Sequence, residues 1–146
     1  MKINVIERTD AQNTTVDITC RTRDEHIERL VDVIRLESDV LCGRGENGEV
    51  RLLNPGQIYY VESVDGRCYI YLESETYRTD SRLCELEEKL PSYSFVRASK
   101  SMIVNLRMAR SLEPESGRKL RMIMKNDEIV VISRQYAAEL KHKLKI

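Results

Sequence analysis

The 146-residue sequence lacks tryptophan, has a single phenylalanine and contains no long apolar run. Its longest uninterrupted apolar stretches are about four residues, far short of the roughly 20 that a transmembrane helix needs. The first residues, Met1 to Arg8, also lack the apolar stretch of a secretory signal. We therefore expect a cytoplasmic protein with one main domain and at most a small appended unit.

Cysteine and histidine are few and scattered, with no C-x-x-C or H-x-x-x-H spacing. They are Cys20, Cys42, Cys68, Cys84, His26 and His142. A zinc site needs clustered ligands, and a disulfide framework needs an oxidising compartment, so we expect no metal, no cofactor and free thiols that are buried or half-buried. Neither histidine is placed to activate a nucleophile, so we expect no enzyme.

The net charge is zero, but the charges are unevenly placed along the chain. Residues 1–50 have seven Lys/Arg against eleven Asp/Glu, residues 51–96 five against eight, and residues 97–146 twelve against five. An excess of Lys and Arg in one part of a neutral protein is typical of a surface that binds a polyanion. An ordinary solvated face can have the same excess of basic residues. We expect the basic groups of the last third to converge on one surface.

The hydropathy pattern is that of a mainly β chain with short helices, an α+β class. Alternation of apolar and polar residues predicts two strands at residues 3–5 and 16–20, and apolar residues at helical spacing follow. The helical stripe is Ile27, Leu30, Val31 and Ile34. This acidic β-β-α unit either packs on the rest of the chain or mediates self-association. We place it in an N-terminal extension, residues 1–50, ahead of a main domain, residues 51–146.

Ten further short strands are predicted, at residues 40–42, 50–53, 58–62, 68–72, 76–79, 95–97, 102–104, 110–112, 120–124 and 129–132. Asn47-Gly48 and Asp65-Gly66 are dipeptides typical of two-residue hairpin turns. A second helix is expected around Leu83, Leu86 and Leu90, and a third after Ser133.

A short basic segment lies between two of these strands. Arg97, Ser99, Lys100 and Ser101 fall within five residues, which suits a loop that offers hydrogen-bond donors to phosphates or base edges. An ordinary exposed loop has the same composition. Taken alone, this segment leaves both interpretations open.

The start of the last helix carries a second feature of the same kind. Arg134 follows Ser133, so a positive charge lies at the positive end of the helix dipole, at a cost of about 0.3 to 1 kcal/mol. Backbone N–H groups and a guanidinium together form a phosphate or guanine site, which makes such a placement useful when an anion binds. Ser133 is alternatively only a helix cap.

Over about residues 55–145 the sequence resembles the LytTR family of bacterial DNA-binding domains. The matching motifs, in order, are Ile58–Ser63, Asp65-Gly66 with Tyr69, Leu83–Leu90, Phe95–Leu106 and Ile132–Arg134. The resemblance implies small stacked antiparallel sheets with little helix. It also implies a transcription regulator that binds repeated promoter sites by placing loops in successive major grooves.

Carried onto this sequence, the resemblance implies that Lys100 and Arg134 read bases and that Arg97 and Ser101 contact the DNA backbone. The third reading position falls near Cys68, where some relatives have histidine. Cysteine cannot offer the same donor, so Arg67 is a possible substitute. The full candidate set is Arg67, Cys68, Tyr69, Arg97, Ser99, Lys100, Ser101, Asn105, Ser133 and Arg134.

Many relatives carry a phosphorylation-receiver domain, which the residues before Gly56 are too few to form. The sequence resembles instead the short members of this response-regulator-like family. The implied partners are double-stranded DNA, a second copy on DNA, and a membrane protein or other protein as regulator. A protein-interaction module without nucleic-acid binding is the alternative that the acidic first third favours, and RNA binding through exposed tyrosines is a third.

Overall fold

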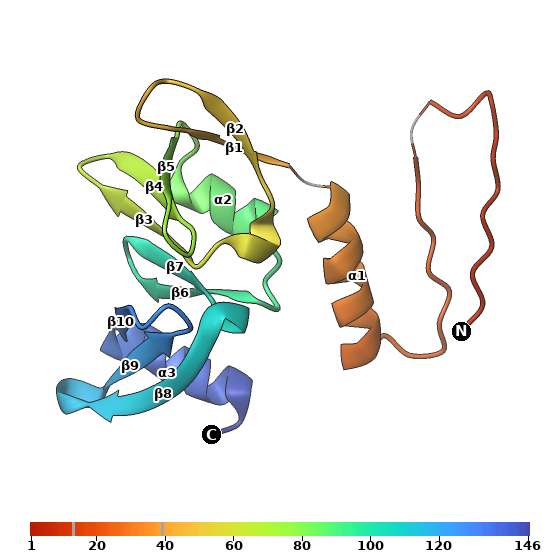
Figure 1. Ribbon diagram of the computed structural model, residues 1–146. Helices are drawn as coiled ribbons and strands as arrows, with labels where there is room; N and C mark the ends of the chain where they lie inside the picture. The colour runs from red at the N-terminus through yellow and green to blue at the C-terminus, as the bar shows by residue number, and fades with distance from the viewer. Residues whose placement is uncertain (13, 39) are drawn as a thin grey trace.

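The computed structural model describes residues 1–12, 14–38 and 40–146, and within them the chain is mostly β with three helices. The helices are α1 (Glu25–Ser38), α2 (Leu83–Lys89) and α3 (Arg134–Leu144). The strands are β1 (Leu41–Arg44), β2 (Val50–Leu53), β3 (Tyr60–Val64), β4 (Arg67–Tyr71), β5 (Thr76–Thr79), β6 (Phe95–Ser99), β7 (Met102–Asn105), β8 (Ala109–Glu115), β9 (Lys119–Met124) and β10 (Ile129–Ile132). Figure 1 shows the sheets with α2 and α3 as one body, and α1 beside it.

Seven strands form one antiparallel sheet in the order β2-β1-β5-β4-β3-β7-β6. Helix α2 covers one face, because Leu83, Leu86 and Leu90 recur at helical spacing and pack in one core cluster with Ile70 and Ile103. Along β4 the burial alternates, so inward-facing residues alternate with residues on the opposite face. The predicted mainly β fold of antiparallel sheets is confirmed.

The last three strands form a second sheet in the order β10-β9-β8, which packs with α3 against β6. Met122 and Ile132 from this sheet, Leu140 from α3 and Ala98 from β6 share a second buried cluster. Helix α3 is therefore held by its apolar side against the edge of the larger sheet, and the position of its first residue is set by that packing.

The two predicted hairpin turns differ. Asp65 and Gly66 both have positive φ, 51° and 77°, and close the two-residue turn between β3 and β4 as predicted. The turn predicted at Asn47-Gly48 is wrong in length, because the Gly45 N–H donates to the Glu49 carbonyl oxygen at 2.9 Å and three residues lie between them. Gly48, with φ of 79°, closes this longer loop.

The two strands predicted ahead of α1 are wrong for the single chain. Residues 1–12 and 14–24 form no strand, and Ile3, Val5 and Val16 are 76%, 89% and 59% exposed. Alternating sequence forms a strand only where a neighbouring strand accepts its main-chain hydrogen bonds, and the described part of this chain provides none here. Helix α1 is confirmed.

We call residues 1–38 the N-terminal arm. Its helix is tied to the body by polar groups, because Arg29 Nε donates to the Tyr93 hydroxyl at 2.7 Å and Asp32 is buried. The seven-stranded sheet begins at Leu41, ahead of the boundary expected at residue 50, since β1 pairs with both β2 and β5. β1 thus belongs to the body by its hydrogen bonds.

The expectation for the cysteines is wrong for three of the four. Cys20, Cys42 and Cys84 are exposed, and Cys68 is buried at 4%. Cys42 and Cys84 lie on the outward positions of β1 and α2, next to Leu41 and Leu83, which take the buried positions. Within residues 1–12, 14–38 and 40–146, no three His, Cys, Asp or Glu side chains are grouped to hold a metal, and no helix is long and apolar enough to cross a membrane.

Candidate nucleic-acid interface

The predicted basic loop is a tight turn between β6 and β7. Ser99 pairs with Met102 across the strands, which leaves Lys100 and Ser101 exposed at the tip. The Ser101 N–H donates to Ser99 Oγ at 3.2 Å, so the hydroxyl of Ser99 braces the turn. A bulge between Arg97 and Ser99 changes the direction of β6 just before it.

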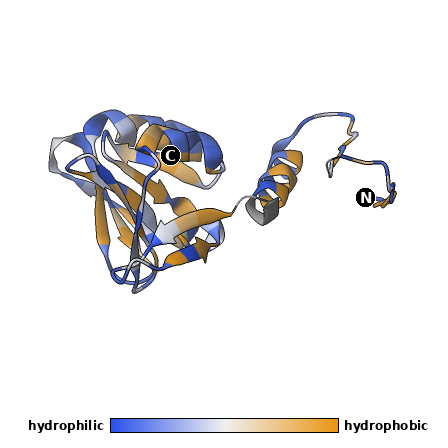
Figure 2. Ribbon diagram, turned by 90° about the horizontal axis from the view of Figure 1, so that it is seen from above, coloured by the Kyte–Doolittle hydropathy of each residue, from blue (hydrophilic) through white to orange (hydrophobic). Residues whose placement is uncertain are grey.

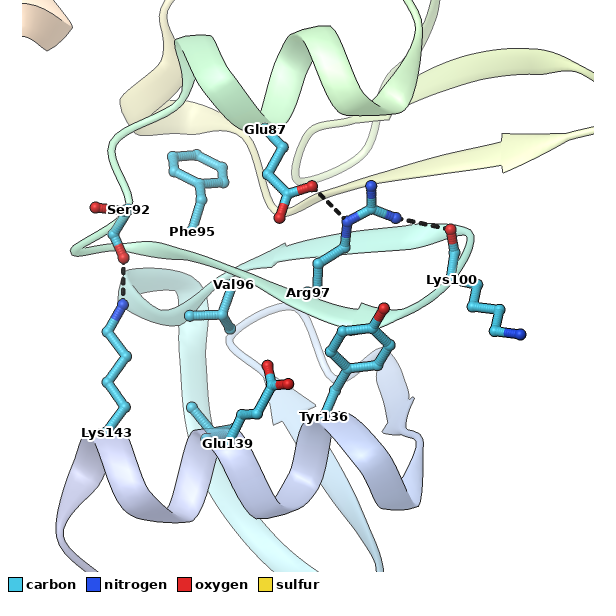
Figure 3. A pocket seen from close by; sticks show the side chains of 10 residues that line it. Glu87, Ser92, Phe95, Val96, Arg97, Lys100, Tyr136, Glu139 and Lys143 are labelled. Atoms are coloured by element: carbon cyan, nitrogen blue, oxygen red, sulfur yellow. Dashed lines mark hydrogen bonds and ion pairs between the residues drawn. The ribbon is translucent and has the colours of Figure 1, made fainter.

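Arg97 holds this loop against α2. Its side chain is 17% exposed, its Nε donates to Glu87 Oε2 at 2.7 Å, and its Nη1 donates to the Lys100 carbonyl oxygen at 2.7 Å. Figure 3 shows the guanidinium between Glu87 and the Lys100 backbone, with the Lys100 side chain directed away from them. Arg97 therefore positions the loop, and Lys100 presents the free-standing charge.

The start of α3 lies beside the same loop. The Ser133 N–H donates to the Ala98 carbonyl oxygen at 2.8 Å, which fixes the first turn of the helix next to β6. Arg134, the first residue of α3, is exposed. Ser133 occupies the N-cap position but makes no side-chain cap hydrogen bond, so its half-buried hydroxyl is available to another acceptor.

The turn at Asp65-Gly66 reaches this region from the other side. The Ser63 N–H donates to the Ser101 carbonyl oxygen at 2.8 Å, so the end of β3 adjoins the basic loop. We call the end of the sheet formed by residues 65–67, 99–101 and 133–134 the loop end. Three segments that are far apart in the sequence meet there through main-chain hydrogen bonds.

Cys68 does not face this surface. It belongs to the core cluster under α2, and burial raises the pKa of its thiol. Arg67 is exposed at the start of β4, and Tyr69 is half-buried on the opposite face of the strand from Cys68. Of the three residues predicted around the third reading position, Arg67 is thus the one that reaches solvent at the loop end.

Asn105 also has a structural role. It is buried, its Nδ2 donates to the Ile58 carbonyl oxygen at 2.8 Å, and its Oδ1 accepts from the Arg107 N–H at 3.0 Å. It ends β7 and caps the following turn, at the opposite end of that strand from the basic loop. Both parts of its amide are occupied, so we exclude it from the interface.

Sequence reasoning missed two residues of this region. Glu87, on α2, is the partner of Arg97 in the tertiary structure. Arg82 follows β5, whose Thr79 pairs with Cys68, and its side chain is 83% exposed. No local pattern marks Glu87, because its partner Arg97 lies on β6, and the place of Arg82 depends on the pairing of β5 with β4.

The basic residues of the last third do not all gather at the loop end. Arg110 pairs with Asp127 at 2.5 Å, and Arg121 pairs with Glu113 at 2.7 Å, both on the second sheet. Lys143, near the end of α3, donates to the Ser92 carbonyl oxygen. It lies nine residues from Arg134, roughly 13 Å along the helix. The expectation of a single convergent basic surface is therefore wrong, although Lys100 and Arg134 lie on neighbouring segments that the Ser133–Ala98 hydrogen bond joins.

A groove of about 450 Å³ borders the loop end, between α2, β6 and α3. Its lining mixes charges of both signs with an aromatic ring, since it includes Glu87, Arg97, Tyr136 and Glu139 (Figure 3). Lys100 and Lys143 also line the groove, so its charges are mixed rather than of one sign. Lys100, at the edge of the groove, and Arg134, at the start of α3, are both exposed to solvent.

Comparison with known proteins identifies the family to which the chain belongs. The model of the LytTr DNA-binding domain matches residues 48–145. The chain belongs to the LytTR family. The family is one of DNA-binding domains rather than of enzymes.

Two relatives and one solved structure illustrate the similarity. Sensory transduction protein LytT of Bacillus cereus is 40% identical over 95 residues, which are 65% of this chain and 39% of that protein. An uncharacterized HTH-type transcriptional regulator of Staphylococcus aureus is 25% identical over 148 residues, covering 100% and 99% of the two chains. The solved LytTr DNA-binding domain of a putative methyl-accepting/DNA response regulator from Bacillus cereus has a TM-score of 0.69 and 27% identity, covering 73% and 97%.

Proposed function

We propose that this LytTR protein is a bacterial transcription regulator of the cytoplasm that binds duplex DNA through its loop end. The observation that carries the proposal is the joining of the β6–β7 turn to the start of α3 by the Ala98–Ser133 hydrogen bond. That bond keeps the exposed charges of Lys100 and Arg134 on neighbouring segments. Two cations held by main-chain contacts can approach one duplex together without first ordering a flexible segment.

In this proposal each residue has a distinct role. Arg134 offers a planar guanidinium that can bind guanine O6 and N7, beside helix N–H groups that favour phosphate. Lys100 extends from the turn tip toward a second base edge. Ser101, Ser133, Arg67 and Arg82 contact the flanking phosphates, and Arg97 with Ser99 keeps the turn in shape.

The shape of the loop end also supports a manner of binding. Turns and a helix start lie at the loop end, not the length of a recognition helix, so each copy reads a short stretch of major groove. We propose that two copies occupy two related short sites at a fixed spacing, near a multiple of the helical repeat of about 10.5 base pairs. Two copies on one face of the duplex give the affinity that one small contact area lacks.

The test is selection of bound duplexes from a random pool with the full chain. We expect enrichment of two related short sites at a constant spacing, and a log–log salt slope of about −4 to −5 for roughly five phosphate contacts. A pool selected with the Lys100→Ala/Arg134→Ala double variant provides the control and should yield no motif. Failure of the unaltered protein to retain any duplex even at low salt would contradict the proposal and favour a protein-interaction module.

A further inference from the structure

The N-terminal arm carries apolar residues that its own chain does not cover. Ile3, Val5 and Val16 are exposed, although they lie in segments whose apolar and polar residues alternate as in a half-buried strand. Figure 1 shows the two segments running in opposite directions beside each other, and Figure 2 shows them well separated from the body. The alternation of apolar and polar residues is typical of strands, but the described part of the chain provides no partner strand for these segments.

The apolar stripe of helix α1 is covered only in part. Ile27, Leu30 and Val31 are half-buried but belong to neither core cluster. The group that α1 buries against the body is the carboxylate of Asp32, which lies about 140° round the helix from Ile27 and about 160° from Leu30. The side of α1 held by the body is therefore not the side that carries most of its apolar stripe.

A unit of this size cannot supply its own core. A two-stranded hairpin is marginal in water, and units below about 40 residues commonly need oligomerisation, a metal or disulfides to fold. Two arms together supply four strands and two amphipathic helices, which is enough for a sheet with one covered face. Residues 1–38 contain six Lys/Arg and eight Asp/Glu, so each arm carries a net charge of −2 but offers both signs of charge to a second arm.

We propose that the N-terminal arm is a dimerisation unit. Residues 3–6 and 16–20 of one copy pair with the same segments of a second copy in a four-stranded antiparallel sheet, and the two α1 stripes cover its apolar face. The inference rests on the proposed function in one respect, since it explains how two copies are brought to paired sites. The Staphylococcus aureus relative aligns along the whole chain and so has residues at the positions of the arm.

The arm is attached to the body at a place far from the loop end, so a dimer formed through the arm would not cover the loop end. α1 meets the body at Tyr93, and Lys143 at the far end of α3 is among the charges near Asp32. Arg134 and Lys100 lie at the opposite end of α3. Pairing through the arm therefore leaves the loop end of both copies open.

Another surface of the body could compete for the arm. β2 is an end strand of the larger sheet, and Val50 and Leu52 are exposed on it. An arm segment added to that edge would also pair its main-chain groups. The two arrangements are separable, because only the second one depends on Leu52.

The experiment is light scattering coupled to size exclusion, with the full chain without DNA over a wide concentration range. We expect the unaltered protein to be a dimer and Val16→Lys/Ile18→Lys to be a monomer. The matched control Thr15→Lys/Thr19→Lys adds the same charge on the other face of the segment and should remain a dimer. Leu52→Lys should also remain a dimer.

Three results would overturn the inference. They are a monomeric unaltered protein at all concentrations, equal behaviour of the two lysine double variants, and loss of the dimer in Leu52→Lys. Affinity for a duplex with a single short site separates this inference from the proposed function. The monomeric variant should bind it as the unaltered protein does, whereas failure of the proposed function would leave a dimer that binds no DNA.

Discussion

The loop end and the N-terminal arm are both made of short segments, but they are held in different ways. At the loop end, main-chain hydrogen bonds from Ser63 to Ser101 and from Ser133 to Ala98 join separate strands and a helix. The arm meets the body through side chains, including those of Arg29 and Asp32. The main-chain contacts of the loop end keep its segments adjacent when an exposed side chain such as Lys100 is changed, whereas the docking of the arm depends on the side chains themselves.

If the loop end binds DNA and the N-terminal arm forms the dimer, the largest effect is loss of DNA binding in variants of the loop end that still form the dimer. Lys100→Ala and Arg134→Ala should each cost about 1 to 3 kcal/mol of binding free energy, because each removes a contact of the interface. Fluorescence anisotropy with a selected duplex measures the affinity, and Lys119→Ala, an exposed lysine on the second sheet, is the control. Tight binding by the double variant at moderate salt would remove the loop end from the mechanism.

The next effect concerns the brace of the loop. Arg97→Met should lower DNA affinity by about tenfold, near 1.4 kcal/mol, because Glu87 and the Lys100 carbonyl oxygen lose their donor and the turn loosens. Arg121→Met breaks a pair of the same length with Glu113 on the second sheet, and it should leave DNA affinity unchanged. Equal affinity in the two variants would show that Arg97 does not position the loop.

A smaller effect separates a core residue from an interface residue. Cys68→Ser should lower the free energy of unfolding by about 1 to 2 kcal/mol, because it places a hydroxyl in an apolar core. DNA affinity should not change. Chemical denaturation and anisotropy give the two quantities, with the exposed Cys84→Ser as the control. A selective loss of DNA binding in Cys68→Ser would return this residue to the interface.

The smallest effect concerns the attachment of α1. Burial raises the pKa of Asp32 above its ordinary 3.8, despite the opposing influence of Arg35, Arg107 and Lys143. The folded state therefore holds this proton more firmly than the unfolded state, so its contribution to stability is complete below pH 3.8 and is lost as the pH rises through the raised pKa.

Asp32→Asn is neutral throughout and should flatten this dependence, making α1 slightly better protected at neutral pH. Hydrogen exchange of α1 amides, corrected for intrinsic rates across the pH range, measures the effect. Asp17→Asn, a change at an exposed carboxylate of the arm, is the control and should keep the pH dependence of the unaltered protein. Indistinguishable profiles for the two variants would mean that Asp32 is not desolvated by docking.

Much of the fold follows from local sequence. The strands at 50–53 and 76–79 and the turn at Asp65-Gly66 form as predicted, because these segments find partner strands in the same chain. The strands predicted at 3–5 and 16–20 have alternating apolar residues and yet fail to form in the single chain. Periodicity indicates which face a strand would bury, but it carries no information on whether a partner strand is present.

The candidate site divides in a similar way. The exposure of Lys100 and Arg134 follows from a turn tip and a helix start, which local sequence marks. The burial of Cys68 and the pairing of Arg97 with Glu87 depend on which face of β4 meets α2 and on where α2 lies, and these are tertiary facts. A count of charges likewise cannot separate Arg134 from Arg121, whose carboxylate partner lies on the neighbouring strand.

The most direct test of the central claim is a base-substitution profile. Every base pair of a selected site is changed in turn, and affinity is measured for the unaltered protein, Lys100→Ala and Arg134→Ala. If the loop end reads the duplex, each variant loses discrimination at one position, and the two positions lie close together within one short site. A uniform loss across all sequences, or altered positions in different sites, would contradict joint reading of one groove by Lys100 and Arg134.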